Sequence, residues 1–206
     1  MCIIDRYPYS ASSTVLKEDS SKLSEHVLIT WSKARPELAG REVSDIAEEL
    51  DWDIFSAAAQ LQPAGAVYFA MAEEDVQRIL SHPNAMIGSD GLPHDEHPHP
   101  RLWGTFPRVL GHYCRDLQLF SLEAAVRRMT GYSAETFGLI DRGIIKPGAF
   151  ADITIFDEDT VLDRATFDKP MTPAAGIDTV LVNGSIVWES GGATGRRPGH
   201  VLRNGG

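Results

Sequence analysis

A short apolar run that ends abruptly at a glycine is the feature of this sequence that most limits the folds it can adopt. Residues 85–87 are apolar, Gly88 follows, and Asp90 lies between a serine and a glycine. In a parallel α/β protein the residue just beyond the carboxyl end of a strand lies on the ligand-binding face. Asp90 is therefore the first candidate for chemistry, and Arg101, after a loop dense in histidine and proline, is a candidate for binding. Aspartates beside glycine are also common in turns and at helix caps, and the spacing favours neither interpretation over the other.

The residues before this block alternate between strand and helix patterns. Helical spacing of apolar residues predicts helices, and β-branched apolar runs predict strands. The predicted helices cover residues 43–50, 53–61 and 73–80. The predicted strands cover 2–4, 26–31, 66–71 and 85–87, and residues 10–14 are expected to form a polar loop. A strand, a helix and a strand with short connections imply a right-handed parallel crossover. We therefore expect Tyr68 to Met71 and Asp90 at the same end of one sheet.

Helices are expected again after the histidine-rich loop. One is predicted over residues 106–113, with Pro107 near its first position. Ser121 is expected to cap a second helix that closes at Gly131, and Ser133 is expected to cap a short third helix.

The pattern changes from about Gly143 onward. Residues 151–156 alternate with period two, as expected of an antiparallel strand with one solvated face. Asn183-Gly184 separates two apolar runs, and this dipeptide suits the two positive φ angles of a tight hairpin. The end of the chain is therefore expected to be a small β module.

Charge and cysteine content limit the possible partners. The chain has 29 acidic and 19 basic residues and a net charge of −10, which argues against nucleic acid or an anionic membrane as partner. Its two cysteines, Cys2 and Cys114, are far apart and suit a reducing cytosol. Neither a membrane span nor a signal peptide is expected, and a cytoplasmic location is predicted.

Several motifs together resemble the N-acyl-D-amino-acid deacylases of the amidohydrolase superfamily. The resemblance covers nearly the whole chain and depends on residues 5–9 with Ser13-Thr14, on 61–66, on 88–94, on 99–106, and on the 151–152 and 182–184 segments. It implies an α/β fold made of the later βα units of a (β/α)8 TIM-type barrel plus part of a small β-sandwich. The implied division is 1–142 for the barrel portion and 143–206 for the β-sandwich portion.

The resemblance also implies a reaction and roles for particular residues. In this family a bound zinc activates water to hydrolyse the amide of an N-acyl-D-amino acid, and an aspartate transfers the proton. Asp90 matches that aspartate, and Arg101 matches the residue that binds the substrate carboxylate, helped by Tyr7 and Ser13. Tyr68 and Met71 match part of the pocket for the amino-acid side chain, which would favour apolar side chains.

The family's zinc ligands have no counterpart among these residues. They are a His-x-His pair, a cysteine and two further histidines, all expected upstream of Met1. His94, His97 and His99 match no ligand position and are expected on the surface or bonded to backbone. Two interpretations follow. The chain is the carboxyl-terminal portion of a zinc deacylase, with self-association possible through its incomplete barrel, or it is a non-catalytic module that keeps the Arg101 pocket.

Overall fold

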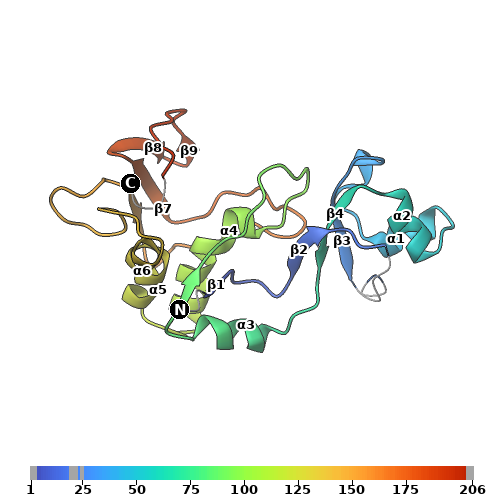
Figure 1. Ribbon diagram of the computed structural model, residues 1–206, viewed down its shortest axis with the longest axis horizontal. Helices are drawn as coiled ribbons and strands as arrows, with labels where there is room; N and C mark the ends of the chain where they lie inside the picture. The colour runs from blue at the N-terminus through green and yellow to red at the C-terminus, as the bar shows by residue number, and fades with distance from the viewer. Residues whose placement is uncertain (1–3, 19–22, 24–25, 203–206) are drawn as a thin grey trace.

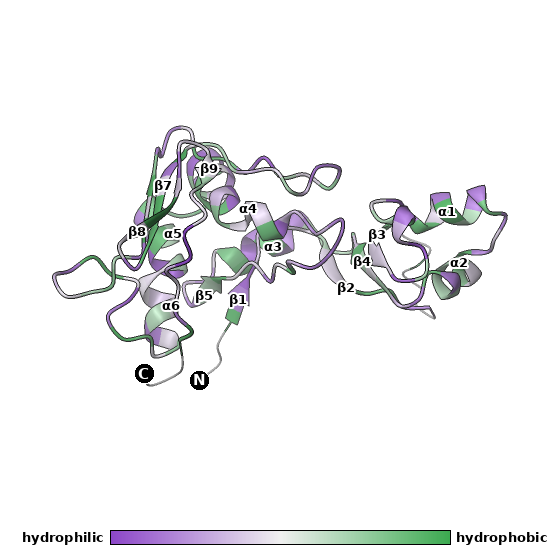
Figure 2. Cartoon of the chain, turned by 90° about the horizontal axis from the view of Figure 1, so that it is seen from above, coloured by the Kyte–Doolittle hydropathy of each residue, from purple (hydrophilic) through white to green (hydrophobic). Residues whose placement is uncertain are grey.

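The computed structural model describes residues 4–18, 23 and 26–202. These residues form two lobes (Figure 1). One lobe contains a three-stranded sheet with two short helices, and the other contains the remaining strands and most of the helices. The view turned by 90° in Figure 2 has the same separation.

The first lobe is an antiparallel sheet covered by short helices. Its elements are β2 (Ser12–Val15), β3 (Val27–Ser32), a 3-10 turn η2 (Pro36–Leu38), α1 (Val43–Glu49), α2 (Ile54–Gln60) and β4 (Ala64–Tyr68). β4 lies between β2 and β3 and is antiparallel to both. The predicted polar loop at residues 10–14 is therefore wrong from Ser12 onward, because an edge strand can pair through its backbone while its side chains stay polar.

The second sheet joins strands that are far apart in the sequence. β1 (Ile4–Arg6) runs parallel to β5 (Ala85–Ile87), and α3 (Glu73–Leu80) precedes β5. The predicted parallel crossover from residues 66–71 to 85–87 is wrong, because β2 and β3 occupy both edges of β4. The expectation that Tyr68 to Met71 share a sheet end with Asp90 fails for the same reason. Of the strand predicted at residues 2–4, only Ile4 lies within the described residues.

A long helical segment follows the histidine-rich loop. α4 (Arg101–Arg108) continues directly into the π-helical turns of η3 (Val109–Asp116). The prediction that this helix begins at Phe106 is wrong, and Pro107 lies inside α4. A proline removes one hydrogen bond from the helical ladder, and here the helix continues beyond it in wider turns.

Two further helices complete the second lobe. In α5 (Leu122–Met129), Ser121 is the N-cap as predicted, because its hydroxyl oxygen accepts from the backbone N–H of Ala124. In α6 (Gly131–Thr136) the predicted caps are wrong. Gly131 begins α6 instead of closing α5, and Ser133 lies inside α6, where its hydroxyl donates to the carbonyl of Arg128 at 2.8 Å.

The strands near the end of the described chain form one four-stranded antiparallel sheet, where the sequence predicts a β module without specifying its number of strands. Its strands in order are β6 (Ile153–Phe156), β7 (Ile177–Val182), β8 (Ser185–Glu189) and β9 (Gly192–Ala193). The β7–β8 hairpin is confirmed, with Asn183 at φ 47° and Gly184 at φ 76°.

Each lobe has its own apolar core. Ile29, Ile46 and Leu61 are fully buried in the first lobe, and Val76 and Val109 are fully buried in the second. No described helix has both the length and the apolar character needed to cross a bilayer.

Candidate active site

Asp90 lies where the chain turns sharply after β5. Its φ is 47°, in the left-handed region that aspartate tolerates better than most residues. A Cβ at Gly91 would overlap the backbone of Leu102, so this position requires glycine, and a Cβ at Gly88 would displace the carboxylate of Asp5. The turn therefore holds Asp90 beyond the strand end with its side chain 63% exposed.

Arg101 begins α4 and reaches back to this turn. Its Nη2 lies 2.8 Å from Oδ2 of Asp90, and its Nε donates to the Asp90 carbonyl at 2.9 Å. The guanidinium also lies over the ring of Tyr7, 4.5 Å from the ring centroid. The side chain is only 2% exposed, yet its Nη1 has no hydrogen-bond partner among the described residues. A buried donor without a partner is costly, so this atom marks a place where an acceptor would be stabilised.

A cavity of about 480 Å³ brings residues of both lobes together. Ser13 of β2 lines it together with Asp90 and Arg101. The further lining residues, none of which the sequence identified as site residues, are Thr14, Val15, Thr30, Trp31, Leu92, His94 and Asp95. Their positions depend on β2 and β3 facing the turn after β5, and no local pattern in the sequence predicts that arrangement.

The cavity is lined by one guanidinium and two carboxyl groups. Arg101 is the cationic group among the lining residues, and Asp90 and Asp95 are carboxylates. Burial raises the pKa of the Asp95 carboxyl, and the nearby charges of His94 and Arg101 oppose that rise. The cavity thus offers one guanidinium to an anionic ligand, with carboxylates beside it.

Three predicted binding residues lie outside the lining of this cavity. Tyr7 stacks on the Arg101 guanidinium. The hydroxyl of Tyr68 accepts from the backbone N–H of Lys17 at 2.9 Å, within the core of the first lobe. The sulfur of Met71 accepts from Nη2 of Arg6 at 3.2 Å. The structure therefore gathers Ser13, Asp90 and Arg101, with Tyr7 behind the arginine, and leaves Tyr68 and Met71 apart.

Two of the loop histidines bond to backbone carbonyls, as the sequence predicted. Nε2 of His97 lies 2.5 Å from the carbonyl oxygen of Phe167, and Nε2 of His99 lies 3.1 Å from that of Ala11. His94 is exposed at the cavity. Burial, followed by the charge of Arg101, lowers the pKa of His99 to about 3, so its ring is neutral.

The described residues do not form a metal site by themselves. Residues 4–18, 23 and 26–202 contain no group of three His, Cys, Asp or Glu side chains placed to hold an ion.

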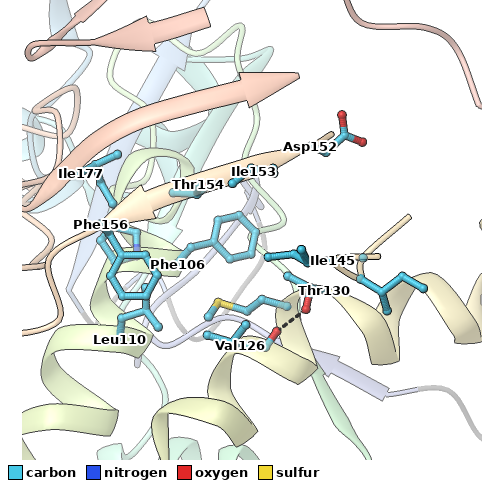
Figure 3. A pocket seen from close by; sticks show the side chains of 14 residues that line it. Phe106, Leu110, Val126, Thr130, Ile145, Asp152, Ile153, Thr154, Phe156 and Ile177 are labelled. Carbon is cyan, nitrogen blue, oxygen red and sulfur yellow. Dashed lines mark hydrogen bonds between the residues drawn. The ribbon is translucent and has the colours of Figure 1, made fainter. Parts of the chain in front are cut away.

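A second cavity, of about 510 Å³, lies away from Asp90 between the helices and β6 (Figure 3). Phe106, Leu110, Val126 and Phe156 line it with apolar surface, and the carboxylate of Asp152 points away from its interior. The only hydrogen bond drawn there joins the Thr130 hydroxyl to the Val126 carbonyl, 2.7 Å apart. Because no charged group faces it, this cavity does not suit a carboxylate ligand.

The neutral state of His99 predicts how stability changes with pH. In the unfolded chain this histidine takes up a proton near its ordinary pKa of about 6.5. The fold excludes that proton down to a pKa of about 3. The stability that the neutral His99 contributes is therefore fully present above about pH 6.5, and it is lost as the pH drops toward the folded-state pKa. From pH 7 to 5.5 the parent should lose about 1 kcal/mol more unfolding free energy than His99→Gln. Urea titrations at both pH values measure this difference, and equal losses would contradict it.

Comparisons with known proteins identify the family of this chain. Residues 48–188 match the model described as "Amidohydrolase family". D-aminoacylase of Alcaligenes xylosoxydans xylosoxydans is 56% identical over 199 residues, which are 97% of this chain and 41% of the relative. A crystal structure of D-aminoacylase matches with a TM-score of 0.89 and 58% identity, over 93% of this chain and 40% of that one. N-acyl-D-glutamate deacylase from Bordetella bronchiseptica, complexed with zinc and a phosphonate mimic of the tetrahedral intermediate, matches with a TM-score of 0.91 and 51% identity, over 97% and 42%.

The chain thus spans about two fifths of the length of these relatives. The structural matches confirm the predicted α/β fold class, that of part of an amidohydrolase barrel with an attached β sheet. The chain belongs to the amidohydrolase family.

Proposed function

We propose that these residues supply the proton-transfer and carboxylate-binding part of a hydrolase that cleaves N-acyl-D-amino acids into a carboxylate and a free D-amino acid. One observation carries most weight. The Arg101 guanidinium is buried. Its Nη2 pairs with the Asp90 carboxylate, its Nε donates to the Asp90 carbonyl, and its Nη1 has no partner among the described residues. A guanidinium with a free N–H suits the planar carboxylate of an amino acid.

Asp90 is the proposed proton-transfer group. Its carboxylate is exposed beside Arg101, so a water molecule and a substrate amide can reach it. As a general base it would take a proton from the attacking water, and as a general acid it would give that proton to the leaving amine. Zinc is the proposed cofactor, since the Bordetella relative is complexed with zinc, and its ligands would come from polypeptide outside this sequence.

The proposed substrate carries an apolar side chain and a single carboxylate. Val15, Trp31 and Leu92 give the cavity apolar surface, and Asp95 would repel a second carboxylate on the substrate. N-acetyl-D-methionine fits this description better than N-acetyl-D-glutamate. Tyr68 and Met71 line no part of this cavity, so the proposed wall for the side chain does not include them. The two widely separated cysteines favour the cytoplasm as the place of action.

Replacement of Arg101 tests the proposal directly. We consider a chimera in which these residues replace the matching part of the Alcaligenes D-aminoacylase. Arg101→Ala in this chimera should weaken binding of N-acetyl-D-methionine by about 1.5–3 kcal/mol, the usual cost of losing a hydrogen bond to a charged group. The amide analogue, which lacks the carboxylate, should lose much less. Steady-state kinetics on both substrates measure the difference, and an equal loss on the two would refute carboxylate binding by Arg101.

The same chimera tests the alternative of a non-catalytic binding module. The absence of a metal cluster among the described residues favours that alternative. A chimera that discriminates acid from amide in binding, but releases no D-methionine with zinc supplied, would support it over the hydrolase.

A further inference from the structure

We propose that His99 is a positioning residue that fixes Arg101 in the orientation needed to bind the substrate carboxylate. This inference depends on the proposed function, because it assigns to His99 a role in the same carboxylate site. His99 is 4% exposed, contacts Arg101 through its ring, and is not among the residues that line the cavity.

Both ring nitrogens of His99 are used, and their partners define the tautomer. Nε2 lies 3.1 Å from the carbonyl oxygen of Ala11, and a carbonyl can only accept, so Nε2 donates. Nδ1 accepts from the backbone N–H of Arg101 at 3.0 Å. A second proton on the ring would face that N–H and the positive guanidinium. The geometry therefore requires a neutral imidazole protonated at Nε2.

The bond from Arg101 to His99 fixes the start of α4. The first N–H groups of a helix have no partner within the helix, and Pro100, at the N-cap, provides no side-chain hydrogen bond. Nδ1 of His99 satisfies the N–H of Arg101, the first helical residue. The imidazole thus determines where the Arg101 backbone lies, and with it the origin of the side chain that reaches Asp90.

Three aromatic rings surround the imidazole, and one of them, that of Tyr7, also contacts Arg101. The rings of Tyr9 and Phe167 lie edge-on to His99, at centroid distances of 5.2 and 5.1 Å. Tyr7 is 6.1 Å from His99 on one side and 4.5 Å from the Arg101 guanidinium on the other. His99 therefore supports Arg101 through its backbone and, by way of Tyr7, through its side chain.

His97 provides a matched control. It lies in the same loop, and its Nε2 also bonds to a backbone carbonyl, that of Phe167. No described hydrogen bond or ring contact joins His97 to Arg101, Tyr7 or Asp90. Loss of a histidine that only anchors the loop should resemble loss of His97, whereas loss of the positioning role should be specific to His99.

The first test is spectroscopic and uses the full chain labelled with ¹⁵N-histidine. Magic-angle-spinning NMR tolerates self-associated protein, and the His99 signal is the one that disappears in His99→Gln. At pH 5 we expect a neutral imidazole whose single ring proton is on Nε2. An imidazolium at that pH, with protons on both nitrogens, or a neutral ring with its proton on Nδ1, would overturn the inference. This readout does not depend on enzyme activity.

The second test measures binding by saturation-transfer NMR on the same chain. The probes are N-acetyl-D-methionine and its amide, N-acetyl-D-methioninamide. In His99→Gln the longer side chain carries its amide toward the position of Nε2, so no acceptor remains where Nδ1 bonds the Arg101 N–H. This variant should weaken the acid about tenfold, equivalent to about 1.4 kcal/mol, and the amide less than twofold. In His99→Asn the side-chain oxygen can accept from the N–H two residues on, as in an Asx-turn, so most of the affinity for the acid should return. His97→Gln should leave both affinities unchanged.

Each outcome separates this inference from the proposed function. If the parent prefers the acid and His99→Gln does not alter that preference, the inference fails and the function stands. If His99→Gln weakens acid and amide equally, or His97→Gln weakens the acid as much, the role of His99 is only structural and the inference fails. If the parent does not prefer the acid, the proposed function fails and the inference fails with it.

Discussion

Replacing Asp90 with asparagine should reduce the turnover of N-acetyl-D-methionine by about 10²- to 10⁴-fold, the usual contribution of a general acid or base. The variant belongs in the chimera with the Alcaligenes D-aminoacylase, and release of D-methionine is the measurement. Asparagine tolerates the left-handed φ of 47° at this position, and the bond from Arg101 Nε to the backbone carbonyl does not involve the side chain. The substitution therefore removes the proton-transfer group and preserves the turn.

Asp95→Asn is the matched control for this variant. Asp95 lines the same cavity and also carries a carboxylate, but it makes no described ion pair with Arg101. Its turnover should stay within about tenfold of the parent, since it is assigned no proton-transfer step. Near-normal turnover in Asp90→Asn, or an equally large loss in Asp95→Asn, would remove Asp90 from the proposed mechanism.

The features that the sequence predicted correctly are controlled by local chemistry. The strand at residues 85–87 is a buried apolar run. Gly88 marks its end, where a Cβ would meet the carboxylate of Asp5. Asn183-Gly184 favours two positive φ angles, so the hairpin could be placed to the residue. Ser121 caps α5 through its own side chain. Each of these depends on a few neighbouring residues.

The features that the sequence missed depend on pairing between distant segments. β4 carries the apolar pattern expected of a barrel strand, but that pattern does not reveal that β2 and β3 occupy both its edges. Tyr68 was therefore expected beside Asp90, whereas its hydroxyl bonds to the backbone of Lys17. The start of α4 was missed because Pro107 is typical of a first helical turn, and a proline inside a helix is rare.

The candidate site shows the same division between local and distant information. Asp90 and Arg101 are eleven residues apart and belong to one continuous motif, so the sequence alone identified them together. Thr30 and Trp31 reach the cavity from β3, which the sequence placed as an ordinary strand with no relation to the site. His99 was expected on the surface or bonded to backbone; it is buried, and it bonds to the carbonyl of Ala11. Its acceptor contact with Arg101 depends on the tautomer, which no sequence pattern specifies.

The isolated chain should bind little zinc and should not hydrolyse N-acetyl-D-methionine. Zinc catalysis needs about three protein ligands in fixed geometry with one open position. The part of the chain that the structure describes contains no such group of His, Cys, Asp or Glu, and the Asp90 carboxylate is paired with Arg101. Asp90 can transfer a proton, but one carboxylate cannot hold a metal tightly. A general base without an activated water should give no measurable turnover.

The same chain should also associate with itself. Within the described residues β1 pairs only with β5, so this two-stranded sheet has free edges that can pair with another chain. Apolar side chains are exposed as well, with Ile145 91% and Val15 62% accessible. Light scattering after size-exclusion chromatography measures the association, and atomic emission measures bound zinc. The zinc-loaded chimera is the positive control for D-methionine release. Stoichiometric zinc in the isolated chain, with steady turnover that Asp90→Asn abolishes, would mean that these residues contain a complete ligand set, and would overturn the proposal that the metal is held from outside them.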